Sequence, residues 1–242
     1  LLDRWWRRQS PARQDRFATI GPLISVLLFL AAIMSAFWYL RMEEVRREQE
    51  AVKRDVEYSQ QRLRLRLLER QEQLMRLARD IANREVDPRQ FEIRAESLVA
   101  QYGELMALSW IDDRRRVVAV QASPSVKAAR DWMEDGILKP GEVESGYGLA
   151  RDLLQPVYSQ PVGVGKAEPI LQLHLPITPR GKFAGELVAE YSVDALLRYG
   201  VPAEILAKYA VALLDSKGQT LAGQSIPDRP GLSEFLPWSG KV

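Results

Sequence analysis

The sequence contains no cysteine and a single histidine, His174, in 242 residues. The absence of cysteine excludes a disulfide framework, a thiolate nucleophile and any zinc site built on cysteine. A single histidine also excludes zinc sites that need two or three imidazoles. We therefore expect neither a metal centre nor a cofactor, in a chain suited to the bacterial periplasm or the cytosol.

An excess of charge of one sign is also missing. The chain has 34 basic and 32 acidic residues, a formal net charge of +2, and its arginines alternate with glutamates along the sequence. Proteins that bind nucleic acids usually concentrate basic residues on one surface. We therefore expect no nucleic-acid partner.

The sequence contains three segments that could suggest a catalytic site, but none has the full set of residues that such a site needs. The segment "GVGKAEP", residues 163–169, lacks the second glycine, the hydroxyl residue and the following helix of a phosphate loop. Asp112 and Asp113 fall in a turn, where aspartate side chains bond to the backbone. His174 lies between two leucines with no obvious serine partner in the sequence, so a structural histidine is expected; the alternative is a pH sensor or a ligand contact. The sequence predicts no catalytic residue.

Charged residues are absent from one long apolar stretch, "FATIGPLISVLLFLAAIMSAFWYL", which runs from Phe17 to Leu40. About 20 apolar residues cross a hydrocarbon core of about 30 Å, whereas the apolar part of a signal peptide has about 7–15 residues. Trp38 and Tyr39 at its far end are typical membrane-interface anchors. The stretch is predicted to be a transmembrane helix; the alternative is a core helix of a soluble protein.

The orientation of the span follows from the length of the segments beside it. Arginines precede the span within residues 1–16, and basic residues follow it within 41–54. Basic residues of short segments favour the cytoplasmic side, whereas large domains translocate largely regardless of their charge. We expect 1–16 in the cytoplasm and the remaining chain outside, in the periplasm of a bacterial inner-membrane protein.

Glycine and proline are absent from the segment 41–84, which is rich in the helix formers Arg, Glu, Gln and Leu. Its apolar residues recur every eleven positions in two rows, which are Val45, Val56, Leu67 and Ala78, and Val52, Leu63 and Leu74. Eleven residues in three turns keep such a stripe on one face of a nearly straight helix. The sequence therefore predicts a signalling helix over 41–86 that continues the span.

This apolar stripe needs a partner. It is expected to pack against the same stripe of a second copy, giving a homodimer, or against the chain's own downstream domain. Leu65, Leu68 and Leu77 are expected to widen the apolar face, so that this part contacts a domain as well. A solvated charged spacer is the alternative.

The segment 87–200 is predicted to be an α+β domain, with helices packed on one antiparallel sheet. Asp87 and Pro88 begin a helix that Gly103 ends. A hairpin follows, with strands at 105–111 and 117–120, and then a helical interval over 123–154. Strands at 155–162, 169–177 and 181–193 and a helix at 193–200 complete the unit.

The order of these elements resembles the Cache family, the PAS-like extracellular sensors of bacterial receptors. The segments that carry the resemblance are the membrane-anchored long helix, "LSWIDDRRRVVAV", "PVYSQPV", "ILQLHLPI" and "GKFAGELVAEYSVDALL". The match covers about Val56 to Gly200. A second helix and hairpin, with strands at 211–214 and 219–222, predicts that 201–242 begins a second, membrane-proximal module; alternatively, this hairpin completes one larger sheet.

The resemblance implies a small-molecule site between the sheet and the helical insert. Carried onto this sequence, the binding residues would be Trp110, Arg130, Trp132, Tyr147, Tyr158, Ser159 and His174. Arg130 would bind a carboxylate, because its planar guanidinium contacts both oxygens at once.

The resemblance also implies that the whole protein is a sensor histidine kinase, with its catalytic domain beyond this chain. The same type of sensor precedes diguanylate cyclases and chemotaxis signalling helices. A membrane-anchored coiled-coil scaffold is the alternative from another class, and it would expose an apolar patch where a sensor has a polar pocket.

Overall fold

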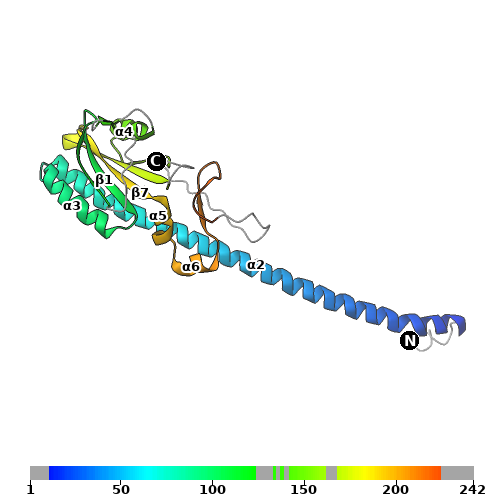
Figure 1. Cartoon of the computed structure of the whole chain (residues 1–242). Coiled ribbons are helices and arrows are strands. Elements are labelled where there is room, and N and C mark those ends of the chain that lie inside the picture. Colours follow the sequence, from blue (N-terminus) through cyan, green and yellow to red (C-terminus); the bar gives the residue numbers. More distant parts are fainter. Residues whose placement is uncertain (1–10, 124–132, 135–136, 139–141, 162–167, 225–242) are drawn as a thin grey trace. The chain divides into compact units, whose positions relative to one another are not determined.

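The computed structural model of the chain describes residues 11–123, 133–134, 137–138, 142–161 and 168–224 (Figure 1). It divides into two units, one ending at Arg54 and the other beginning at Asp55. The fold is α+β, as the sequence predicts: a long N-terminal helix, followed by an antiparallel sheet with helices on its faces.

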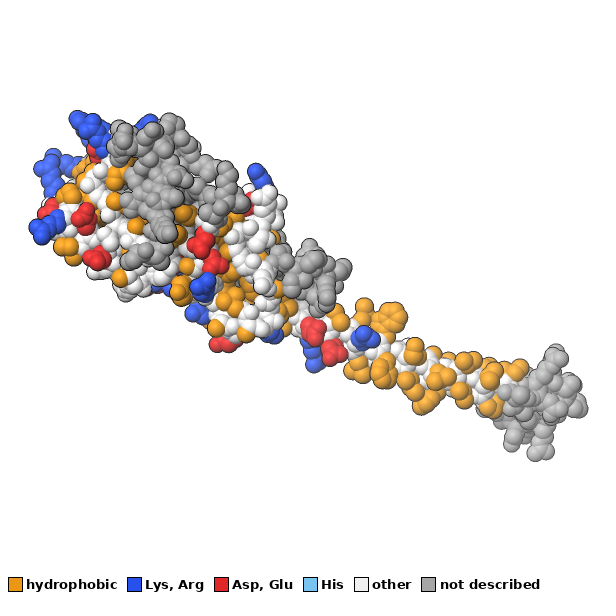
Figure 2. Space-filling view, viewed as in Figure 1, with side chains coloured by type: hydrophobic (Ala, Val, Ile, Leu, Met, Phe, Trp, Pro, Cys, Tyr) orange, Lys and Arg blue, Asp and Glu red, His pale blue; other side chains and the backbone are white. Residues whose placement is uncertain are grey.

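The first unit is the N-terminal part of helix α2 (Pro11–Ala82). Within the described chain, this is the one helix that is long and apolar enough to cross a membrane. Its most apolar window has a mean hydropathy of 2.3, and no residue of that window is buried. Figure 2 shows apolar side chains along this stretch on the visible side. These properties are those of a helix whose side chains face lipid.

The second part of α2 belongs to the domain and supplies a row of its core. The buried residues of this row are Leu63, Leu67, Leu74, Leu77, Ala78 and Ile81. The prediction that the stripe packs on the chain's own domain is therefore confirmed for this part of the helix. The expectation for Leu65 and Leu68 is wrong, because they lie on the opposite side of the helix and are 59% and 48% exposed.

Helix α3 (Pro88–Gln101) begins with the cap that the sequence predicts. The Asp87 side chain accepts a hydrogen bond from the Gln90 backbone N–H at 2.8 Å, and the Gln90 side chain accepts one from the Asp87 N–H at 3.1 Å. This reciprocal pair satisfies two backbone donors that a helix start leaves free. Phe91 and Ala95 are fully buried and direct α3 onto the sheet.

The main sheet has five antiparallel strands in the order β2-β1-β7-β6-β5. Their bounds are β1 (Leu105–Asp112), β2 (Val117–Ala122), β5 (Val157–Tyr158), β6 (Ile170–Ile177) and β7 (Gly185–Ser192). A short 3₁₀ turn, η1 (Pro179–Gly181), joins β6 to β7. At Gly185, φ is +139° and a Cβ would collide with the Ile111 carbonyl oxygen, so only glycine fits where β7 meets β1.

The segment between β2 and β5 differs in part from its predicted helical character. The prediction is confirmed for helix α4 (Glu142–Leu153). It is wrong for β3 (Met133–Glu134) and β4 (Ile137–Leu138), which pair as two short antiparallel strands. The sequence between them is Asp-Gly, a dipeptide favoured in two-residue hairpins. Strand β5 is shorter than the predicted 155–162; Pro156 directly precedes it and has no N–H for the ladder.

The C-terminal described part contains α5 (Val193–Gly200), α6 (Ala203–Lys208), β8 (Ala212–Leu214) and β9 (Thr220–Gly223). The predicted second hairpin is confirmed, since β8 and β9 pair antiparallel. In the described chain they form a two-stranded sheet of their own and do not extend the five-stranded sheet. A small apolar cluster packs this hairpin against α5 and α6; its buried members are Val193, Leu197, Val201, Ile205 and Ala222.

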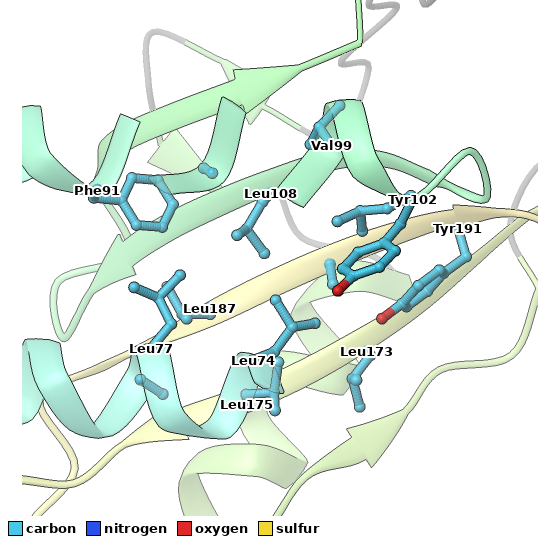
Figure 3. Packing of buried hydrophobic residues seen from close by; sticks show 14 of the residues in the cluster. Leu74, Leu77, Phe91, Val99, Tyr102, Leu108, Leu173, Leu175, Leu187 and Tyr191 are labelled. Carbon is cyan, nitrogen blue, oxygen red and sulfur yellow. The ribbon is translucent and has the colours of Figure 1, made fainter. Parts of the chain in front are cut away.

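The two faces of the main sheet differ in what covers them. Helices α2 and α3 cover one face, where Leu108, Leu173 and Leu187 form the centre of the apolar core (Figure 3). Helix α4 contacts β5, β6 and β7 on the other face (Figure 1). Because side chains alternate along a strand, each strand contributes to both faces.

Candidate functional site

The face of the sheet that α4 covers carries buried polar side chains. We call this group the polar face; it consists of Ser109 on β1, Gln172 and His174 on β6, and Glu186 and Glu190 on β7. All five are at most 6% exposed. They alternate along β6 and β7 with leucine and alanine residues of the apolar core. A group of buried polar residues on one face of a sheet is costly unless its atoms find partners.

The strand register brings these side chains into two pairs. Gln172 lies directly opposite Glu190, and its side-chain N–H donates to the Glu190 carboxylate at 2.9 Å. His174 is the diagonal neighbour of Glu186, and its Nδ1 lies 3.0 Å from Glu186 Oε1. Both pairs bridge β6 and β7, as cross-strand neighbours do.

Four atoms of the polar face have no hydrogen-bond partner in the described part of the chain. They are Ser109 Oγ, Gln172 Oε1, His174 Nε2 and Glu186 Oε2. Leaving one buried polar atom without a partner costs about 1–3 kcal/mol. Each of these four atoms can accept a hydrogen bond, so together they are complementary to a ligand that has donor groups.

Helix α4 lies directly against this face. A Cβ at Gly146 would collide with Nε2 of His174, so glycine allows the helix its close approach. The next residue, Tyr147, is buried; its hydroxyl donates to the Asp112 carbonyl at 3.0 Å, and its ring meets Phe183 edge-on at 5.4 Å. Burial raises the pKa of Tyr147 to about 12, so this side chain is a neutral donor at physiological pH.

The electrostatics of the polar face are set by burial. Burial raises the pKa of Glu186, and the hydrogen bond with His174 opposes that shift. No group of three or more potential metal-ligating side chains is found in the described residues. The chemistry available here is hydrogen bonding and proton binding.

Comparison with known proteins identifies the fold. No protein-family model and no curated protein sequence matches the chain. Among solved structures, the ligand-binding domain of the Campylobacter jejuni chemoreceptor Tlp3, in complex with L-valine, aligns with a TM-score of 0.51 at 14% identity. The alignment covers 76% of this chain and 72% of that one. The chain has the fold of a chemoreceptor ligand-binding domain. The predicted resemblance to the extracellular sensor domains of bacterial receptors is thereby confirmed as a likeness of fold.

Two further solved structures resemble this sensor fold less closely. One is the ligand-binding domain of the Pseudomonas aeruginosa PAO1 chemoreceptor PctC in complex with GABA, with 18% identity, a TM-score of 0.45, and coverage of 65% of this chain and 67% of that one. The other is the extracellular domain of the histidine kinase mmHK1S-Z3, with 14% identity and a TM-score of 0.36. In that case 56% of this chain aligns with 55% of the other.

Within this sensor fold, the residues proposed from the sequence fall into four groups. His174 belongs to the polar face and Tyr147 covers it. Ser159, at the end of β5, accepts from the Gln172 backbone N–H and donates to the Gln160 carbonyl, so its hydroxyl is engaged with the backbone. Arg130 and Trp132 lie outside the described residues.

Trp110 and Tyr158 lie on the opposite face of the sheet, and the structure does not bring them together with His174. Trp110 packs edge-on against Phe91 of α3, with ring centroids 5.9 Å apart. Tyr158 packs against the same apolar core, and burial raises its pKa to about 12. The assignment of strands from the sequence did not include which side chains share a face.

Four members of the polar face were missed by the sequence-based assignment: Ser109, Gln172, Glu186 and Glu190. Their signal was present in "LQLHL" and "GELVAEYS", where polar residues alternate with apolar ones in strands that lie inside the fold. A glutamate in such a strand is usually exposed, whereas both of these are buried in the structure.

A second buried carboxylate is fully engaged and therefore structural. Glu104 accepts two hydrogen bonds from Arg66, at 2.8 and 3.1 Å, and pairs with Arg70 at 3.5 Å. The Arg70 guanidinium also lies 3.5 Å from the centre of the Tyr102 ring. Burial acts to raise the pKa of Glu104, but the hydrogen bond and the charges of the two arginines outweigh it, so that its pKa is lowered.

Proposed function

We propose that this chain is the extracytoplasmic ligand-sensing and signalling region of a bacterial membrane receptor. The observation that supports this proposal is the polar face, a set of buried hydrogen-bonding atoms under a covering helix in a chemoreceptor-type fold. An apolar helix that can cross a membrane precedes that fold. In a scaffold protein, buried hydrogen-bond acceptors without partners would only cost stability.

The receptor class we propose is a sensor histidine kinase, with catalysis outside this chain. A chemoreceptor is the second candidate, favoured by the fold likeness to a chemoreceptor domain. The proposed organisation is a cytoplasmic segment 1–16, a transmembrane helix 17–40, a signalling helix 41–86, a distal sensor module 87–200, and the beginning of a proximal module in 201–242. The proposed location is the inner membrane, with the sensor in the periplasm.

The ligand we propose is a small molecule bound between the sheet and its helical cover. The acceptors of the polar face suit a cationic amine, and Arg130 suits a carboxylate. A molecule that has both an amine and a carboxylate group could therefore bind to the polar face and to Arg130. L-valine and GABA, the molecules bound in two similar structures, each have an ammonium and a carboxylate group. Tyr147, Trp132 and His174 would complete the site.

Thermal unfolding tests this proposal. The full chain in nanodiscs would be mixed with L-valine, GABA or succinate, and the unfolding temperature compared with that of the free protein. We expect stabilisation by at least one amine-bearing probe, and its loss in Arg130→Ala and Gln172→Leu with the unliganded fold retained. Stabilisation that survives both substitutions would place the ligand elsewhere.

We also propose that the receptor is a homodimer through α2, by a different face from the buried stripe. We call this face the outer seam; it consists of Tyr58, Leu65, Leu68 and Met75, which are 36–59% exposed. Their spacings of seven, three and seven residues follow the a and d positions of a heptad repeat. The seam lies on the side of α2 opposite to the row that packs on the sheet, so a second copy can reach it.

A further inference from the structure

The pair formed by His174 and Glu186 has two properties that ligand sensing alone does not require. Both side chains are completely buried, and each keeps its outer atom, Nε2 or Oε2, without a partner in the described residues. The one bond between them, of 3.0 Å, uses Nδ1 and Oε1. The buried pair therefore has spare capacity for a proton.

The charge balance around the pair favours holding that proton. A neutral imidazole beside a carboxylate leaves one negative charge in the interior, where an uncompensated charge is strongly unfavourable. Among the described side chains, the ionisable groups on the face of the pair are Glu190 on β7, Tyr147 and the exposed ion pair of Arg151 and Asp152 on α4, and Asp112 at the end of β1. Tyr158 on β5 and Tyr191 on β7 belong to the apolar core on the other face. None of the buried groups among them is a cation.

We propose that His174 and Glu186 form a proton-binding site through which the polar face and its covering helix α4 respond to external acidity. A proton from the solvent adds to the Glu186 carboxylate, no other bond is made or broken, and the pair becomes neutral. The neutral pair packs under Gly146 of α4 without a buried net charge. Loss of the proton restores the charge and weakens the contact between α4 and β6.

The sign of the effect follows from the direction of the shift at Glu186. Burial raises the pKa of this carboxyl above its ordinary value. A group with a raised pKa contributes stability that is fully present below its unfolded pKa, about 4.3 for glutamate, and is lost as the pH rises through the folded pKa. The domain is therefore expected to be more stable in mild acid than at neutral pH.

The experiment uses the fact that the chain has one histidine. Isotope labelling of histidine in the full chain in nanodiscs gives one set of imidazole NMR signals, which report on the proton of the carboxyl 3.0 Å away. We expect a titration step of these signals above the ordinary pKa of a glutamate, and we expect this step to be absent in Glu186→Gln. The unfolding temperature of the wild type should fall by about 2–4 °C across this step.

Glu186→Gln should remove this fall, because glutamine has the shape of the protonated acid and no charge. Glu190→Gln is the matched control on the same strand and face, and it should keep the pH dependence. A wild-type imidazole signal without a titration step would overturn the proposal even if a variant failed to fold. So would a Glu186→Gln protein with the full wild-type pH dependence. No ligand is added, so the result does not depend on the proposed ligand.

Discussion

At the scale of single residues, the buried carboxylates of Glu104 and Glu186 have opposite environments. The oxygens of Glu104 are bonded to Arg66 and Arg70, whereas Glu186 has one bond and one free oxygen in the described structure. Burial acts to raise the pKa of both carboxyls, but the hydrogen bonds and charges of the arginines lower the pKa of Glu104, whereas the pKa of Glu186 stays raised. Bonds to arginine therefore distinguish Glu104, which has a structural role, from Glu186, for which we propose proton binding.

Glu104→Gln should destabilise the domain by about 3 kcal/mol, because it leaves the buried side of two arginines without their countercharge. Urea unfolding at pH 7 measures this loss. The lowered pKa of Glu104 means that its contribution is present above the unfolded pKa and lost as the pH falls through the folded one. The wild type should therefore lose stability towards low pH more steeply than the variant.

The control is Asp80→Asn, which removes the partner of Arg94 in an ion pair that is partly exposed to solvent. Such pairs contribute about 0–1 kcal/mol. A loss for Glu104→Gln as small as that of the control would contradict the structural role assigned to the buried cluster.

For single residues, the sequence did not predict on which face of the sheet each side chain lies. The cap formed by Asp87 and Gln90 could be predicted, because capping depends on neighbours within four residues. The site could be predicted only in part, because the face on which Trp110 or His174 lies depends on register across strands far apart in the sequence. Glu186 was missed for the same reason.

At the scale of elements, α2 has an inner face and an outer face with different partners. The eleven-residue stripe was predicted correctly as a repeating apolar face, and the structure uses its Leu63 to Ala78 part for the core of the domain. A repeat alone does not say which surface covers it. The outer seam was not recognised in the sequence as a separate face, since the leucines of the buried stripe, Leu63, Leu67 and Leu74, lie between its four residues.

Leu68→Glu should separate the proposed dimer and leave the fold intact, because Leu68 is half exposed on the outer seam. Analytical ultracentrifugation of the detergent-solubilised chain measures the dimer, and circular dichroism measures the fold. Leu67→Glu is the matched comparison one residue away; it places a charge in the core and should unfold the domain. A Leu68→Glu protein that remains fully dimeric would show that the outer seam is not the interface.

At the scale of the whole molecule, the absence of native cysteine makes the membrane topology directly measurable. A single cysteine at Arg180, in the turn between β6 and β7, should react with a membrane-impermeant maleimide in cells whose outer membrane is permeabilised. A cysteine at Gln9, before the span, should react only after the inner membrane is broken. The reverse pattern would place the domain in the cytoplasm and exclude the receptor orientation.

The Glu104 cluster also determines how the domain bears mechanical load. Packed apolar side chains hold a helix on a sheet, and charge-assisted hydrogen bonds add strong directional contacts between the two. Arg66 joins α2 to Glu104 and to the Tyr199 carbonyl at the end of α5, while the Glu104 carbonyl accepts from Ser192 at the end of β7. A pull along this part of α2 therefore reaches the central strands β1 and β7 through Glu104 as well as through the apolar core.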